Sequence, residues 1–219
     1  MLWSFLYQLG GACTDLLKSL FLLIPLEAAF ILFARKRGYR ISSLHITGVC
    51  FFELLLLLIF IITGIPSFKE LLAHGIVIRP DTLNLLPFAY ITEDIFPYIA
   101  NIILFIPFGI ICPILWRCKR SFWHTVMSGF LLSLLIEISQ LFNFRVTDVD
   151  DLLMNTLGTA VGYAGFLVIR RIMPRISNKL ALEKGGGFPT SRLLKWEPCL
   201  LCSTAFISSF VLLPYLTWY

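Results

Sequence analysis

The chain has 219 residues, of which 58% are hydrophobic and 14% are charged, and its formal net charge at pH 7 is +5. A soluble domain is nearer ~45–50% apolar and ~25% charged, so this composition excludes a disordered chain, a coiled coil and a disulfide-stapled secreted module. It also argues against a soluble enzyme, because so few polar groups could not cover its surface. We therefore expect an integral membrane protein.

Hydrophobic stretches follow one another along the chain, and each approaches the ~20 apolar residues that a membrane-spanning helix needs. The second stretch is the most apolar, with Glu53 as its only charge, whereas the fifth contains Asn155, Thr156 and Thr159. The sequence therefore predicts an all-α polytopic helix bundle of about six transmembrane helices, which form one membrane domain over residues 1–219. The predicted spans are 16–34, 45–63, 97–116, 124–142, 151–169 and 199–217.

The loops between these stretches predict the orientation, because cytoplasmic loops retain Lys and Arg. If the N-terminus lies outside, the inner loops hold the cations of residues 35–40, 117–120 and 170–195. The outer loops then keep only a few cations: Lys69, Arg79 and Arg145. We therefore expect both termini outside, a basic cytoplasmic loop at 170–198 and an extra C-terminal span at 199–217. Basic loops beside an anionic leaflet also explain the net charge, so we expect membrane lipids, and no nucleic acid, as partners.

Three polar side chains lie at a shared depth near the outer ends of three predicted helices. Asn101 and Asn155 each lie four residues inside a span, and Glu137 lies five residues inside another. At 1.5 Å per residue, all three are roughly 6–8 Å below the same boundary. Polar groups inside a membrane are costly and usually face other helices, water or a ligand, so we expect these three to share one site.

The connection between the fourth and fifth spans extends this polar surface. Helical spacing places Asp151 and Asn155 on one stripe of the fifth span, and Glu137 and Gln140 on one stripe of the fourth. The connection carries further charges above these stripes: Arg145, Asp148 and Asp150. Because the connection is short, the two helices are expected to be antiparallel neighbours.

Structural roles compete with a binding role for several of these residues. Asp151 is the expected N-cap of the fifth span, where a carboxylate accepts from free backbone N–H groups. Arg145 can pair with Asp148 or Asp151 to fix the hairpin, and Asn155 can bridge two helices as a polar contact. These roles do not exclude a function.

Three sequence blocks follow one another in order along the chain: Asn101-Ile-Ile-Leu-Phe-Ile-Pro-Phe-Gly109, Glu137-Ile-Ser-Gln140 and the block from Arg145 through Asp148, Asp151 and Asn155 to Gly158. Together these blocks resemble the VanZ family. Upstream, Asn84-Leu-Leu-Pro87-Phe88 resembles the loop that precedes the family's Asn/Pro/Gly helix, and we expect it to fold against the outer face of the bundle. The resemblance covers about residues 50–165. It implies a bacterial plasma-membrane protein, and the name-giving member is associated with low-level resistance to the glycopeptide antibiotic teicoplanin.

The outward position of the polar residues favours binding or protection of a cell-envelope component. The guanidinium of Arg145 suits a phosphate or carboxylate, and the amides of Asn101, Gln140 and Asn155 suit sugar or peptide groups. A lipoglycopeptide or a lipid-linked wall precursor would meet this surface from outside. The predicted ligand-binding residues are Asn84, Asn101, Glu137, Gln140, Arg145, Asp148, Asp151 and Asn155.

Two other classes of function remain open. A membrane-embedded enzyme acting on a lipid-linked or phosphate-bearing substrate would use Glu137, Asp148 or Asp151. No cofactor motif is evident, but Asp148, Asp150 and Asp151 are candidate oxygen ligands for a divalent cation such as Mg²⁺. A proton-coupled transporter would instead need a polar path that reaches Glu27 and Glu53 inside the first two spans.

Overall fold

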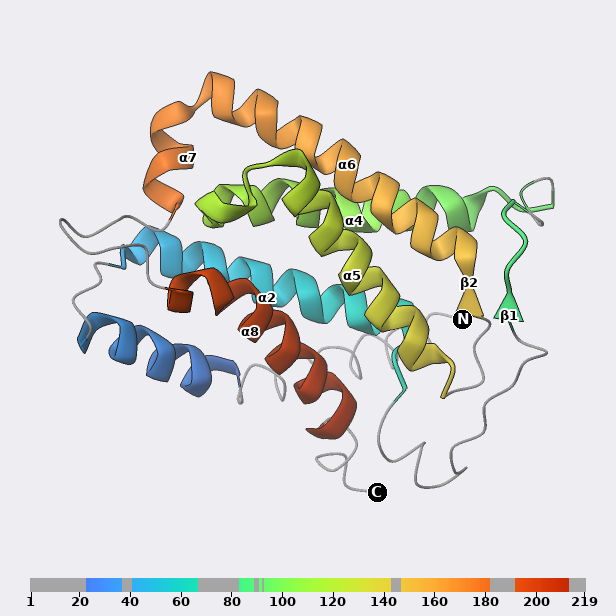
Figure 1. Ribbon diagram of the computed structural model, residues 1–219, viewed down its shortest axis with the longest axis horizontal. Coiled ribbons are helices and arrows are strands. Elements are labelled where there is room, and N and C mark those ends of the chain that lie inside the picture. The colour runs from blue at the N-terminus through green and yellow to red at the C-terminus, as the bar shows by residue number, and fades with distance from the viewer. Residues whose placement is uncertain are drawn as a thin grey trace, which may run out of the picture.

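The computed structural model describes residues 23–36, 41–66, 83–88, 91, 93–142, 147–181 and 192–212. These residues form a bundle of elongated helices, with one pair of two-residue strands at its end (Figure 1). The all-helical class predicted from the sequence is confirmed in this part of the chain.

Four helices are long and apolar enough to cross a membrane: α2 (Ser43–Thr63), α4 (Phe96–Leu115), α5 (Phe122–Gln140) and α6 (Val149–Ile172). They match the predicted second to fifth spans to within about three residues at each end, the accuracy that hydropathy allows. Residues 23–36 form a further helix, and the rest of the first predicted span lies outside the described residues. The last span is represented by α8 (Arg192–Ile207) and the π-helical turn Ser208–Leu212. The described residues therefore contain four candidate spanning helices, and the expected count of six is not confirmed.

Local sequence explains where two of these helices begin and end. The side chain of Ser42 accepts from the backbone N–H of His45 and so caps α2. Gly64 ends α2 in the left-handed conformation, with φ 65°, and returns its N–H to the carbonyl of Phe60. Helix α6 is capped by Asp148, whose carboxylate accepts from Asp150. Our expectation that Asp151 caps this helix was therefore wrong, because the helix begins two residues earlier than hydropathy indicated.

Helices α4 and α6 run in the same direction and pack closely, because glycines remove the side chains between their backbones (Figure 1). A Cβ added at Gly158 would overlap the carbonyl oxygen of Ile102, and one added at Gly162 would overlap that of Ile106. The pattern Gly158-Thr-Ala-Val-Gly162 thus allows direct backbone contact, as small residues do in membrane bundles. This contact fixes α4 and α6 relative to each other at the end that carries the polar residues.

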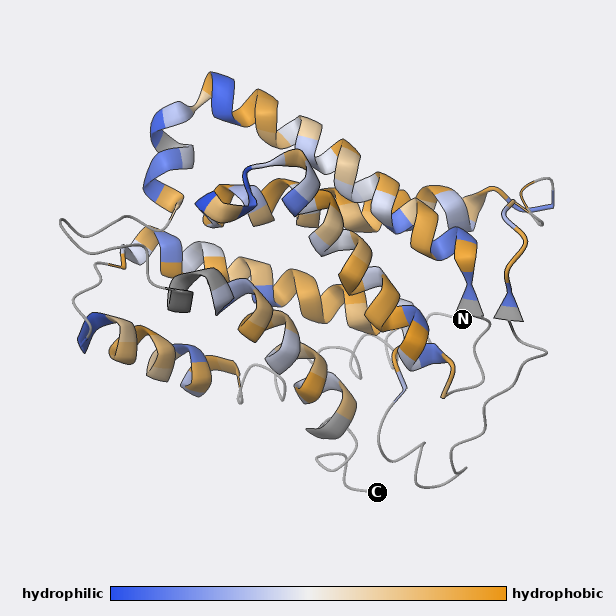
Figure 2. Ribbon diagram, viewed as in Figure 1, coloured by the Kyte–Doolittle hydropathy of each residue, from blue (hydrophilic) through white to orange (hydrophobic). Residues whose placement is uncertain are grey.

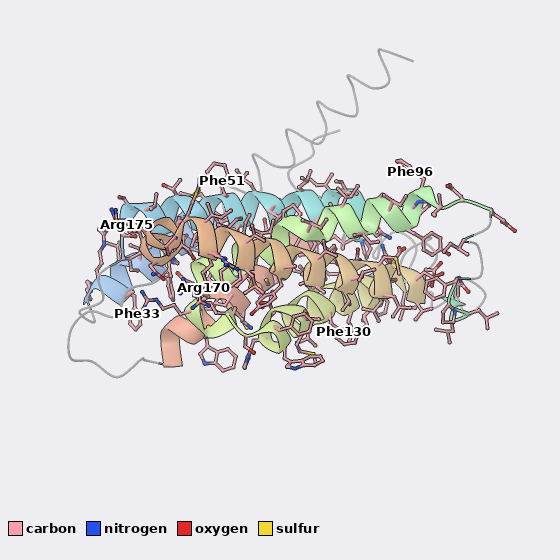
Figure 3. The ribbon with its side chains drawn as sticks, turned by 90° about the horizontal axis from the view of Figure 1, so that it is seen from above. Phe33, Phe51, Phe96, Phe130, Arg170 and Arg175 are labelled. Atoms are coloured by element: carbon pink, nitrogen blue, oxygen red, sulfur yellow. The ribbon has the colours of Figure 1, made fainter. Side chains whose placement is uncertain are left out.

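The interior and exterior of the bundle are both apolar. Large side chains such as Phe52, Phe105 and Trp116 are almost fully buried and form the core with Ile136. The exterior also carries large apolar groups, among them Phe51 and Phe96, which project from the ribbon in Figure 3. An apolar exterior around an apolar core is what a lipid solvent requires.

Charge separates the two ends of the bundle. Arg35, Arg117 and Arg170 mark one end, where Figure 2 shows the hydrophilic helix termini on the left, and Arg175 lies there in Figure 3. The opposite end carries the two short strands and the acidic start of α6. The predicted basic loop at 170–198 is largely helical in its described parts, since it contains the end of α6, the short helix α7 (Pro174–Leu180) and the start of α8.

Candidate functional site

A short strand pair joins the upstream segment to the start of α6. Strand β1 (Leu83–Asn84) pairs in parallel with β2 (Thr147–Asp148), and Asn84 lies opposite Asp148 in the register. The Asn84 side chain donates from Nδ2 to Asp148 Oδ2 at 3.1 Å, and its Oδ1 accepts from the backbone N–H of Leu86 at 3.2 Å. The expected folding of this segment against the end of the bundle is therefore confirmed for residues 83–88.

The carboxylate of Asp150 holds the other end of the same segment. It is buried and accepts twice from the backbone N–H of Phe88, at 2.8 and 2.9 Å, and once from the Tyr98 hydroxyl at 2.8 Å. Phe88 adopts φ 61°, which is unusual for a residue with a side chain, and its ring stacks on that of Tyr98. Asp150 thus links residues 83–88, α4 and α6.

Glu137 connects α5 to this assembly. Its side chain is buried, and Oε2 accepts from the backbone N–H of Asp148 at 3.2 Å. Asp148 and Asp151 are also the acidic residues whose charges act on the Glu137 carboxyl. Through Asp148, Glu137 is therefore linked to Asn84, although these residues are far apart in the sequence.

Two further contacts join the helices below these residues. Asn101 on α4 donates from Nδ2 to Asp151 Oδ1 on α6 at 2.5 Å. Asn155, one turn further along α6, donates to Ser133 Oγ on α5 at 2.9 Å, and its Oδ1 is buried without a hydrogen-bond partner among the described residues. The shared depth predicted for Asn101, Glu137 and Asn155 thus corresponds to three neighbouring polar contacts at one end of the bundle.

We call the polar residues that make these contacts at one end of the bundle the outer-end cluster, after the orientation that the sequence predicts. It contains Asn84, Asn101, Ser133, Glu137, Asp148, Asp150, Asp151 and Asn155.

Gln140 makes its hydrogen bond outside the outer-end cluster, and Arg145 cannot be placed relative to it. Gln140 donates instead from Nε2 to the carbonyl of Thr63, at the end of α2, over 2.8 Å, and its Oε1 has no hydrogen-bond partner in the described part of the chain. Arg145 lies outside the described residues. The anion-binding fork expected from Arg145 therefore stays a prediction from the sequence alone.

Neither Tyr98 nor the role of Asp150 in fixing residues 83–88 was identified from the sequence. Tyr98 lies three residues before Asn101, so helical spacing places both on one face of α4, and this signal could have identified Tyr98. Asp150 was expected only as a candidate metal ligand, because no local pattern indicates a contact with a segment some 60 residues upstream.

The aspartates of the outer-end cluster are engaged by protein donors. Asp148 accepts from Asn84 and from the backbone of Asp150, while Asp150 accepts from Phe88 and Tyr98. Among the described residues, no group of three His, Cys, Asp or Glu side chains is arranged to hold a metal ion. The geometry of the described residues therefore does not support the divalent-cation site that the sequence suggested at these aspartates.

Glu27 and Glu53 do not join the outer-end cluster. They line a separate cavity together with Glu197, which falls within the predicted cytoplasmic loop at 170–198 but is buried in α8. Glu197 accepts from Trp116 Nε1 and approaches His45, so the helix that carries it packs against the ends of α2 and α4.

The spanning helices, the apolar exterior and the polar groups at one end define a multi-pass membrane protein. The VanZ/LLP1 family model matches residues 51–170, which is more than half of the chain. The protein belongs to this family, as its sequence blocks indicated, and the match includes every residue of the outer-end cluster. No curated protein and no solved structure shows a match to the chain.

Proposed function

We propose that the outer-end cluster faces the outside of a bacterial plasma membrane and binds a cell-envelope component. The observation that carries this proposal is the gathering of polar side chains from β1, α4, α5 and α6 at a single end of the bundle. Such groups are expensive in a membrane unless they serve a contact or a ligand. The basic residues at the opposite end support the orientation, because cytoplasmic ends retain Lys and Arg.

The chemistry of the outer-end cluster favours a ligand rich in hydroxyl and amide groups. Its described members are carboxylates, amides and a hydroxyl, and the buried Oδ1 of Asn155 is an acceptor that still lacks a donor. Sugars and peptides supply such donors. A lipid-linked wall precursor carries such donors together with an apolar chain. This chain can pack along the lipid-facing side of the bundle. Arg145 would add a contact to a phosphate.

Mass spectrometry of lipids that copurify with the protein tests this binding. We expect a wall-precursor lipid with the wild type, and its loss with Asp151→Asn, which removes the negative charge and replaces one of the two acceptor oxygens with an amide donor. Glu93→Gln is the matched control, because Glu93 is an exposed acid at the same end. Recovery of the same lipids, in the same amounts, from the wild type and Asp151→Asn would contradict the proposal.

The family suggests a role in teicoplanin resistance, which follows if the bound component is the target of the antibiotic. Cells that express the wild type should then tolerate more teicoplanin than cells that express Asp151→Asn at equal membrane abundance, whereas Glu93→Gln should behave as the wild type. Equal minimum inhibitory concentrations for the wild type and Asp151→Asn would argue against this role.

A second candidate is an enzyme that uses the Glu137 carboxyl as a general acid. The specific observation in its favour is a buried carboxyl beside two other acids, an environment in which catalytic acids are found. Transport receives less support, because the lining of the cavity at Glu27 and Glu53 includes no member of the outer-end cluster.

A further inference from the structure

Three glutamates from different helices surround one cavity away from the outer-end cluster. Glu27 belongs to the helix at residues 23–36, Glu53 to α2 and Glu197 to α8, and their side chains are only 7%, 2% and 1% exposed. In Figure 1 these three helices lie together, below α6. The cavity between them measures about 120 Å³, which is smaller than a typical pocket of ~300–1,000 Å³ for a drug-sized ligand.

Two of the glutamates that line this cavity carry an oxygen atom without a hydrogen-bond partner among the described residues. Glu53 Oε1 and Glu197 Oε1 are buried without a hydrogen-bond partner among the described residues. The other oxygen of Glu197 accepts from Trp116 Nε1 at 2.6 Å. His45 Nε2 lies 3.4 Å from that same oxygen, and His45 Nδ1 lies 2.8 Å from the carbonyl of Leu180.

Within the described part of the chain, the glutamates outnumber the basic groups that face them. Among the described residues, His45 is the basic side chain that interacts with Glu197 and Glu27. One imidazole can balance at most one carboxylate, and a buried carboxylate without a proton or a cation is strongly destabilising. When these carboxyls are ionised, the cavity therefore suits a positively charged ligand.

The residues that line the cavity indicate the chemical class of that ligand. Leucines and Phe30 form most of the lining, and two of the leucines, Leu26 and Leu200, are also 45% and 48% exposed on the outside of the bundle. In the described part of the chain, no set of three acidic, His or Cys groups is close enough to hold a metal ion. A primary ammonium carries three N–H donors, so it can reach separated carboxyl groups, and an attached apolar chain can leave between the exposed leucines.

We propose that the cavity between residues 23–36, α2 and α8 binds a primary ammonium group carried on an apolar chain, with Glu27 and Glu53 as its acceptors. The ligand enters from the membrane side, past Leu26 and Leu200. This site is distinct from the outer-end cluster and does not depend on the function proposed for that cluster.

Thermal unfolding of the purified full-length protein in detergent tests the site with n-butylammonium as the probe. A ligand that binds the folded state raises the unfolding midpoint in a saturable way. We expect this rise in the wild type and in Glu93→Gln. In Glu53→Gln, which loses a charged acceptor, we expect the affinity for n-butylammonium to fall by roughly tenfold or more. The neutral n-butanol should give no saturable rise. Equal shifts in the wild type and Glu53→Gln, or equal shifts from n-butanol, would overturn the proposal.

A second measurement on the wild type keeps the test valid if Glu53→Gln fails to fold. A hydrophobic carbodiimide activates carboxyl groups embedded in a membrane, and the activated carboxyl either rearranges to an N-acylurea or couples to an amine with release of a urea. Peptide mapping therefore follows the sum of the N-acylurea and the n-butylamide formed at Glu27 and Glu53. Saturating n-butylammonium should slow this labelling, whereas n-butanol should leave it unchanged. Labelling that proceeds at the same rate with and without the amine would contradict the assignment of these glutamates.

Discussion

Asp150 shows how one side chain can organise a site without contacting a ligand. Its buried carboxylate accepts hydrogen bonds from the Phe88 N–H and the Tyr98 hydroxyl, and its own backbone N–H donates to the carboxylate of Asp148. Hydrogen bonds to a charged group are the stronger ones in proteins. The position of residues 83–88 over the outer-end cluster therefore depends on this carboxylate.

We predict that Asp150→Asn destabilises the protein by about 1–3 kcal/mol, because the amide cannot accept all the bonds of the carboxylate. The measurement is the free energy of unfolding in detergent, together with proteolysis within residues 83–88. Tyr98→Phe removes only one of the donors and should cost about 1 kcal/mol. An Asp150→Asn protein as stable and as protease-resistant as the wild type would show that this carboxylate does not hold the segment.

The contact between α4 and α6 depends on glycine at particular positions. A side chain at Gly158 would meet the backbone of Ile102, which cannot turn aside as a flexible side chain can. At Gly165, by contrast, an added Cβ would lie 3.4 Å from side-chain atoms of Ile110, which is ordinary van der Waals contact. The two glycines of one helix therefore provide a matched pair.

Gly158→Ala should destabilise the protein by about 1–3 kcal/mol, because the helices must separate or strain to admit the methyl group. Gly165→Ala should be neutral, or stabilising by up to about 1 kcal/mol through its higher helix propensity. Unfolding midpoints of the two purified variants measure the difference. If Gly158→Ala were as stable as Gly165→Ala, direct backbone contact would not govern this helix pair.

Sequence patterns predicted the elements better than their partners. Hydropathy located α2, α4, α5 and α6 closely, because the length and polarity of a span are local properties. The pairing of Asn101 with Asp151 depends on the rotation of two helices about their axes, which a single sequence leaves open. Asp150 and Glu197 were misjudged for the same reason, since their partners lie on segments distant in the chain.

At the scale of the whole molecule, the separation of charge is the feature that gives the bundle a direction. The described cations gather with the ends of α4 and α6. Apart from the three glutamates of the separate cavity, the described acidic residues gather with the strand pair at the other end. A membrane with an anionic cytoplasmic surface favours the basic end on its inner side. The proposed function requires this orientation, because a wall component meets the protein only from outside.

Cysteine accessibility tests this orientation most directly. In a variant whose six native cysteines are replaced by serine, Leu85→Cys introduces one thiol beside the strand pair, where Leu85 is 71% exposed. The matched variant retains only Cys118, which is exposed at the basic end. We predict that a membrane-impermeant maleimide labels Leu85→Cys in intact cells and labels Cys118 only after permeabilisation. The reverse pattern would place the outer-end cluster in the cytoplasm and contradict the proposed function.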